Sequence, residues 1–331
     1  MVNAAIVGVG RWGQRLIDST SAPPARAIRF THAVARTPEN AHNFCEKHGL
    51  RLSSHLDGVL TDPSVAAIVL ATPHSQHAEQ VVKVARSGKH VFIEKPFTLD
   101  LASAVRAADA CRRAGVVLAL GHNRRFLPAM AKIKRLVASG ELGEILHLEG
   151  AFSGNFGLGY QPGVWRATRE ESPAGGMTAM GIHIIDAFIH LAGVVRAVRC
   201  ESHRKVLTVD LDDTTSAFLR FESGATGYLS TLTATGRMVR VQVFGTKGWA
   251  HLLDHHILET SDIDGRVTRQ EFPPTDIERS ELEAFAEAVE GKAPYPVPVG
   301  EVLHGIAVME ATFRSAVRDG ERVTVQPTQG A

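Results

Sequence analysis

The feature that most constrains the fold is a glycine-rich turn placed directly after a short apolar run. Residues 2–7 (VNAAIV) have the composition of a buried parallel strand, and Gly8, Gly10 and Gly13 follow in the pattern G-x-G-x-x-G. Residues 12–19, after the turn, have a helical pattern. A strand, this turn and a helix in succession predict the first unit of a doubly wound α/β sheet.

The alternation of strands and helices continues to about residue 120. This rhythm is typical of βαβ units on a parallel sheet, so we predict a Rossmann domain over residues 1–122. Further strands are expected at residues 29–36, 66–72, 90–93 and 116–120, and helices at 38–49, 75–87 and 99–114.

The pattern changes after residue 122, and residues 123–331 are predicted to form a second, α+β domain. Long alternating runs joined by short turns favour a mostly antiparallel sheet. A stretch rich in Gly, Pro and aromatic residues, 154–174, has no regular pattern, and loops of that length are usually functional or disordered. Strands are expected at 195–205, 213–221, 225–233, 239–245 and 249–253 and after 321, and helices at 127–139, 276–290 and 299–318.

The three glycines have separate roles in a dinucleotide-binding turn. Gly8 makes the tight turn, Gly10 lets the backbone approach a pyrophosphate, and Gly13 allows the helix to pack close to the strand. The helix N-terminus, which includes Arg11 and Trp12, offers free N–H groups to the phosphates. We therefore expect a nicotinamide dinucleotide here; the alternative is a glycine turn that binds nothing.

The end of the second predicted strand discriminates between the two nicotinamide cofactors. An NAD enzyme usually has Asp or Glu there for the ribose 2′-hydroxyl, whereas a nearby Arg suits a 2′-phosphate. This chain has Ala35-Arg36-Thr37 and no acid. We favour NADP(H) and keep NAD(H) as possible; the alternative is that Arg36 is only a solvated loop residue.

Glu94, Lys95 and Pro96 follow the fourth predicted strand, at the edge where open α/β sheets bind ligands. A partly desolvated lysine there is suited to proton transfer or to bonding a substrate hydroxyl. Glu94 could orient it, and Pro96 fixes the local backbone and can follow a cis peptide bond. A surface lysine opening a loop is the alternative.

The overall composition excludes several classes of function. Thirty-six basic and thirty-five acidic residues give a net charge of +1, which predicts no nucleic-acid or membrane partner. The three cysteines are far apart, and no run of about 20 apolar residues occurs. We expect no signal peptide, because the first residues reach a glycine without a basic region. We expect a cytoplasmic protein. The sixteen histidines show no metal-binding spacing, so no metal is predicted.

Residues 175–191 are apolar enough for a buried helix. His183 and Asp186 are three residues apart and share a face of that helix. An imidazole paired with a carboxylate is a common device for tuning a base near neutral pH. Asp186 is expected to be either a substrate ligand or a partner of the histidine, and a satisfied core histidine is the alternative for His183.

Several short motifs occur together over nearly the whole chain. Besides the glycine turn they are Thr72-Pro73-x-x-x-His77, Glu94-Lys95-Pro96, Asn123-Arg124-Arg125-Phe126, Trp165-Arg166, Gly175-Gly176 and Gly181-Ile182-His183-x-x-Asp186. In this order and at these separations they resemble the Gfo/Idh/MocA oxidoreductases, a family that includes glucose–fructose oxidoreductase and inositol dehydrogenase.

The resemblance implies a Rossmann domain followed by a domain with an open, mostly antiparallel sheet that often forms a dimer or tetramer interface. It implies hydride transfer between a nicotinamide and a small sugar, polyol or diol. Lys95 would be catalytic and His183 a second catalytic or substrate-orienting group. Trp165 and Arg166 would close over the nicotinamide and substrate, and the cofactor site would be lined by Thr72, Pro73, His77, Glu94 and Asn123.

One position departs from the family pattern. Many dehydrogenases of this type have an aspartate four residues before the histidine, where this chain has Ala179. The loss of that carboxylate indicates a different substrate, a proton relay that uses Lys95 and His183 only, or no redox activity. A non-catalytic NAD(P)-binding regulator and an NAD-dependent glycosidase of the same family therefore remain as alternatives.

Overall fold

The computed structural model describes residues 1–21 and 27–328, and the chain divides into two compact units. The first consists of Met1–Thr98, Ala102–Asn123 and Asp276–Val299, and the second of Leu99–Leu101, Arg124–Thr275 and Gly300–Ala331. The chain enters the second unit briefly at Leu99–Leu101, and its next crossing, after Asn123, is close to the expected boundary after residue 122. Residues 276–299 return to the first unit, although the sequence had placed them in the second domain.

The first unit is built on a parallel sheet whose strand order is β3-β2-β1-β4-β5-β6. The central strands are almost completely buried because they are covered on both faces, which explains their continuous apolar runs. The short β3 was not predicted. The strands are β1 (Val2–Val7), β2 (Ile28–Val34), β3 (Arg51–Ser53), β4 (Ala67–Leu70), β5 (His90–Glu94) and β6 (Leu118–Gly121).

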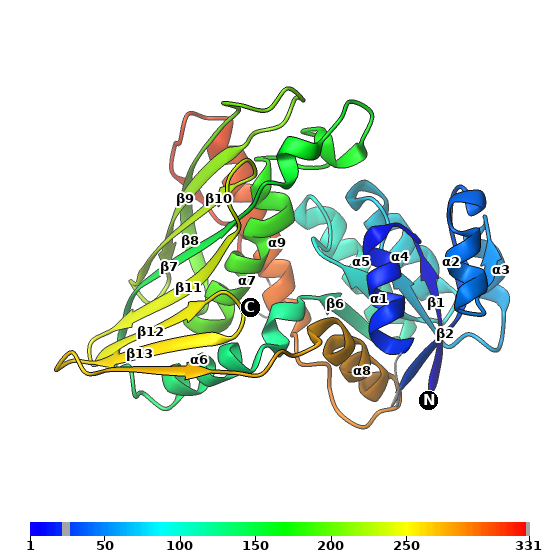
Figure 1. Ribbon diagram of the computed structural model, residues 1–331, viewed down its shortest axis with the longest axis horizontal. Helices are drawn as coiled ribbons and strands as arrows, with labels where there is room; N and C mark the ends of the chain where they lie inside the picture. The colour runs from blue at the N-terminus through cyan, green and yellow to red at the C-terminus, as the bar shows by residue number, and fades with distance from the viewer. Residues whose placement is uncertain (22–26, 329–331) are drawn as a thin grey trace. The chain divides into compact units, whose positions relative to one another are not determined.

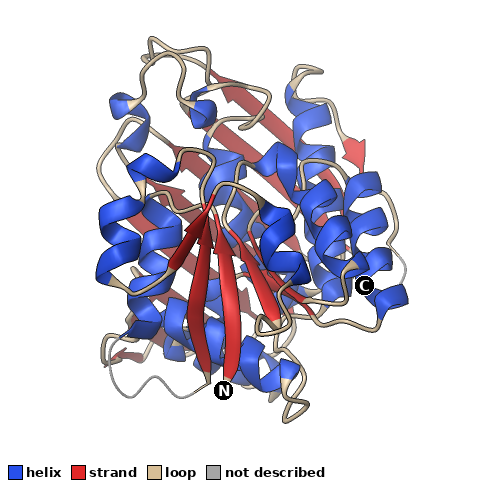
Figure 2. Ribbon diagram, turned by 90° about the vertical axis from the view of Figure 1, so that its right-hand side faces the viewer, coloured by secondary structure: helices blue, strands red, loops and turns tan. Residues whose placement is uncertain are grey.

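Helices cover this sheet on either side (Figure 2). Helix α8 (Ile277–Val289) packs with α1 (Arg11–Ser21), and Phe285 of α8 lies 5.7 Å from the ring of Phe92 on β5. The return of α8 therefore completes the core of the first unit. The other helices are α2 (His42–Lys47), α3 (Leu56–Thr61), α4 (His77–Arg86) and α5 (Leu101–Ala114), with short 3-10 turns η1 (Pro38–Asn40), η2 (His74–Gln76) and η3 (Asn123–Phe126).

The second unit is built on a nine-stranded sheet with the order β14-β13-β12-β11-β7-β10-β9-β8-β15. β7 and β10 pair in parallel, and the other neighbours run antiparallel, which confirms the mostly antiparallel prediction. The strands are β7 (Ile145–Ser153), β8 (Val195–His203), β9 (Thr214–Phe221), β10 (Thr226–Leu232), β11 (Met238–Gly245), β12 (Gly248–Leu253), β13 (Ile257–Asp262), β14 (Val267–Glu271) and β15 (Val323–Thr324).

Helices α6 (Pro128–Ala138), α7 (Ile182–Ala192) and α9 (Val299–Ala316) lie along one face of this sheet (Figure 1). Gly150 of β7 permits the close approach of α7, because a Cβ there would be 2.3 Å from Ile184 Cγ2. The stretch 154–174 contains only the 3-10 turns η4 (Phe156–Gly159) and η5 (Trp165–Ala167), as its composition predicted. Across residues 1–21 and 27–328, the helices are all too short or too polar to span a membrane.

Candidate functional site

The carboxyl edge of the first sheet gathers the predicted cofactor residues. β1 and β4 are neighbours although β2 and β3 lie between them in sequence, so the strand order reverses there. This is the position at which doubly wound sheets bind ligands. The residues that follow the strand ends are Gly8 after β1, Arg36 after β2, Thr72 and Pro73 after β4, Lys95 after β5 and Asn123 after β6.

The three glycines of the first turn have different surroundings. Gly8 has φ +97°, and a Cβ there would be 2.5 Å from the carbonyl oxygen of Ala71. A Cβ on Gly13 would be 2.0 Å from the carbonyl oxygen of Gly8. Gly10 is exposed, and a Cβ there would meet nothing within 4 Å. Packing thus requires two of the glycines, whereas the third leaves the backbone open to an external group, which fits a pyrophosphate.

Arg36 lies two residues beyond β2, with an exposed side chain. Arg11 is also exposed, at the first position of α1, and Trp12 beside it is half-buried. Both arginines are therefore accessible to a bound nucleotide at the edge that carries the glycine turn.

His77 joins two loops of this edge. Its ring is completely buried, with Nδ1 2.9 Å from the carbonyl oxygen of Pro96 and Nε2 3.0 Å from that of Thr72. The Thr72 hydroxyl donates to Gln80 Oε1 at 2.6 Å. His77 therefore holds the Thr72–Pro73 and Lys95–Pro96 loops together. Its place in the lining of the cofactor site stays a prediction.

Glu94 and Lys95 end β5, and the peptide between Lys95 and Pro96 is cis. Glu94 Oε2 accepts a hydrogen bond from the Lys95 backbone N–H at 3.3 Å. Burial raises the pKa of the Glu94 carboxyl, and the neighbouring positive charge of Lys95 partly offsets this. Gly121 on β6 leaves room for the carboxyl, because a Cβ there would be 3.0 Å from Glu94 Cδ.

Asn123 is held by a residue that the sequence analysis missed. Its Nδ2 donates to Glu278 Oε1 at 2.9 Å, and the other oxygen of Glu278 accepts from Arg15 at 2.8 Å. Glu278 is only 8% exposed. One carboxylate of α8 therefore links the end of β6 to the helix that follows the glycine turn.

In the second unit, a π-helical turn, η6 (Met177–Gly181), leads directly into α7. Gly175 and Gly176 allow it to pack tightly, because a Cβ on Gly175 would be 2.0 Å from the carbonyl oxygen of Asp212. π-helical turns within helices occur frequently at functional sites. Here the turn carries Ala179, and α7 then carries His183.

His183 is 4% exposed and contacts an arginine. Arg124 Nη1 lies 2.9 Å from His183 Nε2 and 3.3 Å from Nδ1. The Arg124 guanidinium also stacks on Phe152 of β7, 4.6 Å from the ring centroid. Arg124 stands in the Asn-Arg-Arg-Phe motif, but its contact with His183 could not be deduced from that motif.

Asp186 has a different arginine partner. Arg125 binds it through two nitrogens, at 2.7 Å and 2.9 Å, and also binds Glu301 of α9 at 2.6 Å. Arg125 Nη1 donates to Nδ1 of His190 at 2.9 Å. This buried network ties α7 to α9 and gives Asp186 a structural role. Its contact with substrate or with His183 stays a prediction.

Trp165 and Arg166 lie in η5, within the irregular stretch, where the Arg166 guanidinium stacks 4.0 Å from the indole. Nearby Arg169 binds the buried Asp212 at 2.8 Å. The loop that carries the two predicted closing residues is thus fastened to the β8–β9 connection of its own unit.

Comparison with known proteins identifies the family. A model of an oxidoreductase family with an NAD-binding Rossmann fold matches residues 2–122, and one of the GFO/IDH/MocA C-terminal domain matches residues 130–251. Scyllo-inositol 2-dehydrogenase (NAD(+)) of Bacillus subtilis is 28% identical, over 75% of this chain and 72% of that protein. An uncharacterised oxidoreductase of the same organism is 30% identical, over 74% and 72%. The chain belongs to the Gfo/Idh/MocA family of oxidoreductases.

Solved structures agree with this membership. An NADPH-dependent oxidoreductase from Desulfitobacterium hafniense, 26% identical, superposes with a TM-score of 0.91 over 98% of this chain and 97% of that one. The first unit is accordingly the NAD-binding Rossmann domain of a Gfo/Idh/MocA protein. The second is the family's C-terminal domain with its mostly antiparallel sheet, as the sequence predicted.

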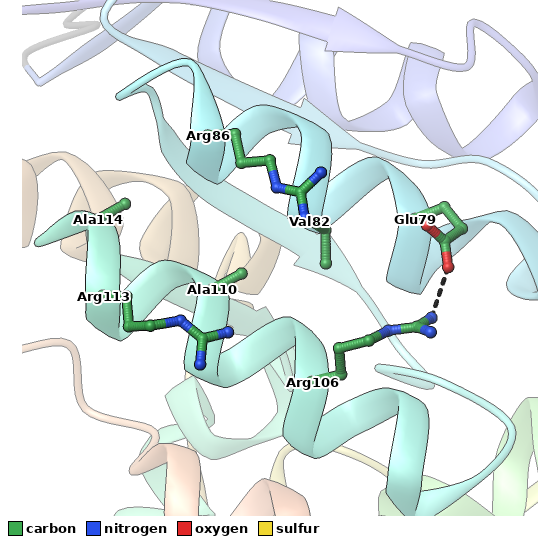
Figure 3. A pocket seen from close by; sticks show the side chains of 7 residues that line it. All are labelled: Glu79, Val82, Arg86, Arg106, Ala110, Arg113 and Ala114. Atoms are coloured by element: carbon green, nitrogen blue, oxygen red, sulfur yellow. Dashed lines mark hydrogen bonds and ion pairs between the residues drawn. The ribbon is translucent and has the colours of Figure 1, made fainter.

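A hollow of about 420 Å³ in the first unit is separate from the predicted cofactor site at the carboxyl edge of the sheet. It lies between α4 and α5 (Figure 3), and none of the predicted site residues lines it. Arg86 and Arg113 point into it from the last turns of their helices. Positive charge is favourable there because the helix dipole places partial negative charge at that end.

Proposed function

We propose that this protein is an NAD(P)-dependent dehydrogenase acting on a secondary alcohol or carbonyl of a sugar, polyol or diol. The observation that carries the proposal is the carboxyl edge of the first sheet. Gly10, whose backbone is open to an external group, and the half-buried Lys95 both stand at this edge, where the strand order reverses between β1 and β4. The substrate class is supported by the related dehydrogenase whose name gives scyllo-inositol, a ring polyol, as its substrate.

Each predicted catalytic residue has a distinct task. When bound, the nicotinamide supplies the hydride chemistry, and the protein supplies orientation and proton handling. Lys95 donates a hydrogen bond to the substrate oxygen and carries its proton. Glu94, protonated more readily than an ordinary glutamate because it is buried, limits the negative charge beside Lys95. His183 orients the substrate hydroxyl.

The turnover test uses a panel of sugars, inositols and diols with NADP⁺ and NAD⁺ in parallel, following reduced cofactor by absorbance. We expect net reduction of cofactor with at least one polyol, and a Lys95→Ala variant should lose about 10²-fold or more of kcat because it lacks the proton-transferring group. Full turnover by Lys95→Ala would refute the assignment. Glycoside cleavage without net cofactor reduction would support the glycosidase alternative, and binding without turnover a regulator.

We further propose that the preferred cofactor is NADP(H). Arg36 is exposed just beyond β2, where no acidic residue stands to bind a ribose 2′-hydroxyl. One structural neighbour is named as an NADPH-dependent oxidoreductase, whereas the name of one relative gives NAD(+). An Arg36→Ala variant should lose affinity for NADPH by about tenfold and leave NADH binding unchanged. Tighter binding of NADH by the wild-type protein would contradict the preference.

A second copy of the chain is the proposed partner of the second unit, through the sheet face opposite α6, α7 and α9. Tyr228 and Phe218 are cross-strand partners on that face, with rings 6.0 Å apart, and Phe218 is 54% exposed. Their neighbour Glu149 pairs with Arg240 at 3.1 Å. An aromatic surface interrupted by a charged pair is suited to a specific protein interface.

The three cysteines bear on the location of the protein. All three are buried and free, which supports a reducing, cytoplasmic location.

A further inference from the structure

The hollow between α4 and α5 is separated from the cofactor edge by the way the chain is connected. A helix that joins two parallel strands carries the chain back to the start of the next strand. The last turns of α4 and α5 therefore lie toward the amino edge of the first sheet, whereas the glycine turn and Lys95 lie at its carboxyl edge. A ligand in this hollow would leave the predicted dinucleotide site open.

One face of each helix borders the hollow, and the lining residues recur at steps of three or four, as expected for a single helix face. They are Glu79, Val82 and Arg86 of α4, with Arg106, Ala110, Arg113 and Ala114 of α5. Val82 is only 8% exposed, and the two alanine side chains are too short to fill the space of about 420 Å³. The hollow thus combines an apolar floor with arginine side chains (Figure 3).

The side-chain charges around the hollow are unbalanced. Arg106 pairs with Glu79, the one acid of the described lining, at 2.5 Å. Arg86 and Arg113 make no hydrogen bond or ion pair with any residue in the described part of the chain. A guanidinium stays charged at every pH at which proteins are folded. Three arginines against one glutamate therefore leave a charge of +2.

The ends of the two helices neutralise only part of this charge. Arg86 and Arg113 lie in the last turns of α4 and α5. Each helix C-terminus carries about half a negative elementary charge, so the two ends together offset about one positive charge. A positive charge of about +1 remains, with two like-charged guanidinium groups around one space. A bound anion would relieve this repulsion.

The chemistry of the lining favours a phosphate group as that anion. The planar fork of a guanidinium matches the oxygens of phosphate through two parallel hydrogen bonds. A phosphate monoester carries a charge of about −1.5 to −2 at pH 7, which suits two arginines better than a single carboxylate does. Sites for small molecules measure about 300–1,000 Å³, so this hollow has room for a phosphate and a small organic group against Val82 and Ala110.

We propose that the hollow between α4 and α5 binds a phosphate group through Arg86 and Arg113, either as inorganic phosphate or as the ester of a small organic molecule. The Glu79–Arg106 pair, two turns earlier on each helix, borders the other end of the space. This second site is independent of the proposed dehydrogenase activity, and it stands or falls without a turnover assay.

The test is a titration of the ¹⁵N-labelled full-length protein with inorganic phosphate at constant ionic strength, followed by the backbone amide signals. NADPH is present to occupy the glycine turn, and the assigned amides report the two sites separately. We expect saturable shifts in the last turns of α4 and α5. The absence of saturable shifts there would overturn the proposal.

A parallel titration with glycerol phosphate distinguishes the two sources of the phosphate group. Tighter binding of the ester would show that its organic part contacts the apolar floor around Val82. Equal affinity for the two anions would assign the hollow to free phosphate. Shifts confined to the glycine turn with both anions would refute the site.

Charge variants at exposed positions test which side chains bind the anion. Arg86→Gln and Arg113→Gln should each raise the Kd for phosphate about tenfold, because each removes charged hydrogen bonds. Glu79→Gln should lower the Kd by about threefold, because it releases Arg106 from a surface ion pair. Exposed substitutions of this kind leave the fold intact.

Arg112→Gln is the matched control, since it removes the same charge from the same end of α5. Arg112 is exposed and pairs with Asp109 at 2.8 Å, outside the hollow. Its replacement should change the Kd by less than about twofold, because solvent and salt screen a charge that does not touch the ligand. Equal weakening by Arg112→Gln and Arg113→Gln would reveal only a general attraction to a basic surface and would overturn the proposal.

Discussion

Gly10 and Gly13 belong to one turn but have different surroundings. A Cβ on Gly13 would be 2.0 Å from the Gly8 carbonyl oxygen, whereas one on Gly10 would meet nothing within 4 Å. We predict that Gly13→Ala lowers the free energy of unfolding by about 1–3 kcal/mol through overpacking. Gly10→Ala should stay within about 0.5 kcal/mol of the wild type, as an exposed substitution does.

Cofactor binding should show a different pattern in the same two variants. The Gly10→Ala methyl group would occupy the space that the open backbone leaves for the pyrophosphate, so the Kd for NADPH should rise by at least about tenfold, or 1.4 kcal/mol. Thermal unfolding and NADPH fluorescence titration measure the two effects. Wild-type affinity in a folded Gly10→Ala protein would show that the pyrophosphate does not approach this turn.

At the residue scale, the sequence predicts side chains that belong to local motifs and misses their distant partners. Gly10 and Lys95 follow predicted strands, so sheet topology alone places them at one edge. Asn123 and its partner Glu278 are 155 residues apart, and Arg125 and Asp186 are 61 apart. The neighbouring sequence of an acidic residue in a helix does not show whether its side chain is buried against a distant partner or exposed to solvent.

At the element scale, long periodic elements are predictable and short or exposed ones are not. β3 has three residues, and all five residues of β14 are exposed, so neither has an apolar alternation to detect. The amphipathic pattern of α8 predicts a helix without saying which core it joins. The π-helical form of η6 depends on how Gly175 and Gly176 pack against neighbouring segments, so a buried helix was the most the sequence could indicate.

Two half-buried histidines, His190 and His255, make the stability of the second unit depend on pH. Burial, with the charges of Arg125 and Lys134, lowers the pKa of His190 to about 4, and His255 has a pKa of about 4 as well. An unfolded histidine titrates near 6.5, so between these values the unfolded chain binds more protons. The stability that these histidines contribute is full above pH 6.5 and is lost as pH falls toward 4.

We therefore expect the free energy of unfolding to fall as pH falls from 6.5 to 4. Its slope against pH should decrease, by the equivalent of about one bound proton, with each replacement, His190→Gln or His255→Gln. Glutamine can still accept the hydrogen bond from Arg125 at position 190. Urea unfolding at a series of pH values measures the slope. His203→Gln, at a position 67% exposed, is the control, and an unchanged slope in the double variant would contradict the assignment.

For the whole molecule, the balance of charge and the exposed sheet face bear on association. A net charge of +1 gives little long-range repulsion between copies. Phe218 and Tyr228 form one row of the face with Glu149, Gln242 and His251, which share their side of the sheet through register. A row of mixed aromatic, polar and charged groups across five strands can pair specifically with its own copy.

We predict that the wild-type protein is a dimer or tetramer by light scattering at micromolar concentration and that Phe218→Asp shifts it toward monomer. A buried, unpaired carboxylate in an interface is strongly unfavourable, whereas the same carboxylate on an isolated unit is solvated and costs little. NADPH affinity should persist in the variant, because the glycine turn and Arg36 stand on the other unit. Val317→Asp, at an 83% exposed apolar position after α9, is the matched control and should leave the mass unchanged. A monomeric wild type would show that the chain does not self-associate through this face. An unchanged oligomer mass in Phe218→Asp would show that the association surface lies elsewhere.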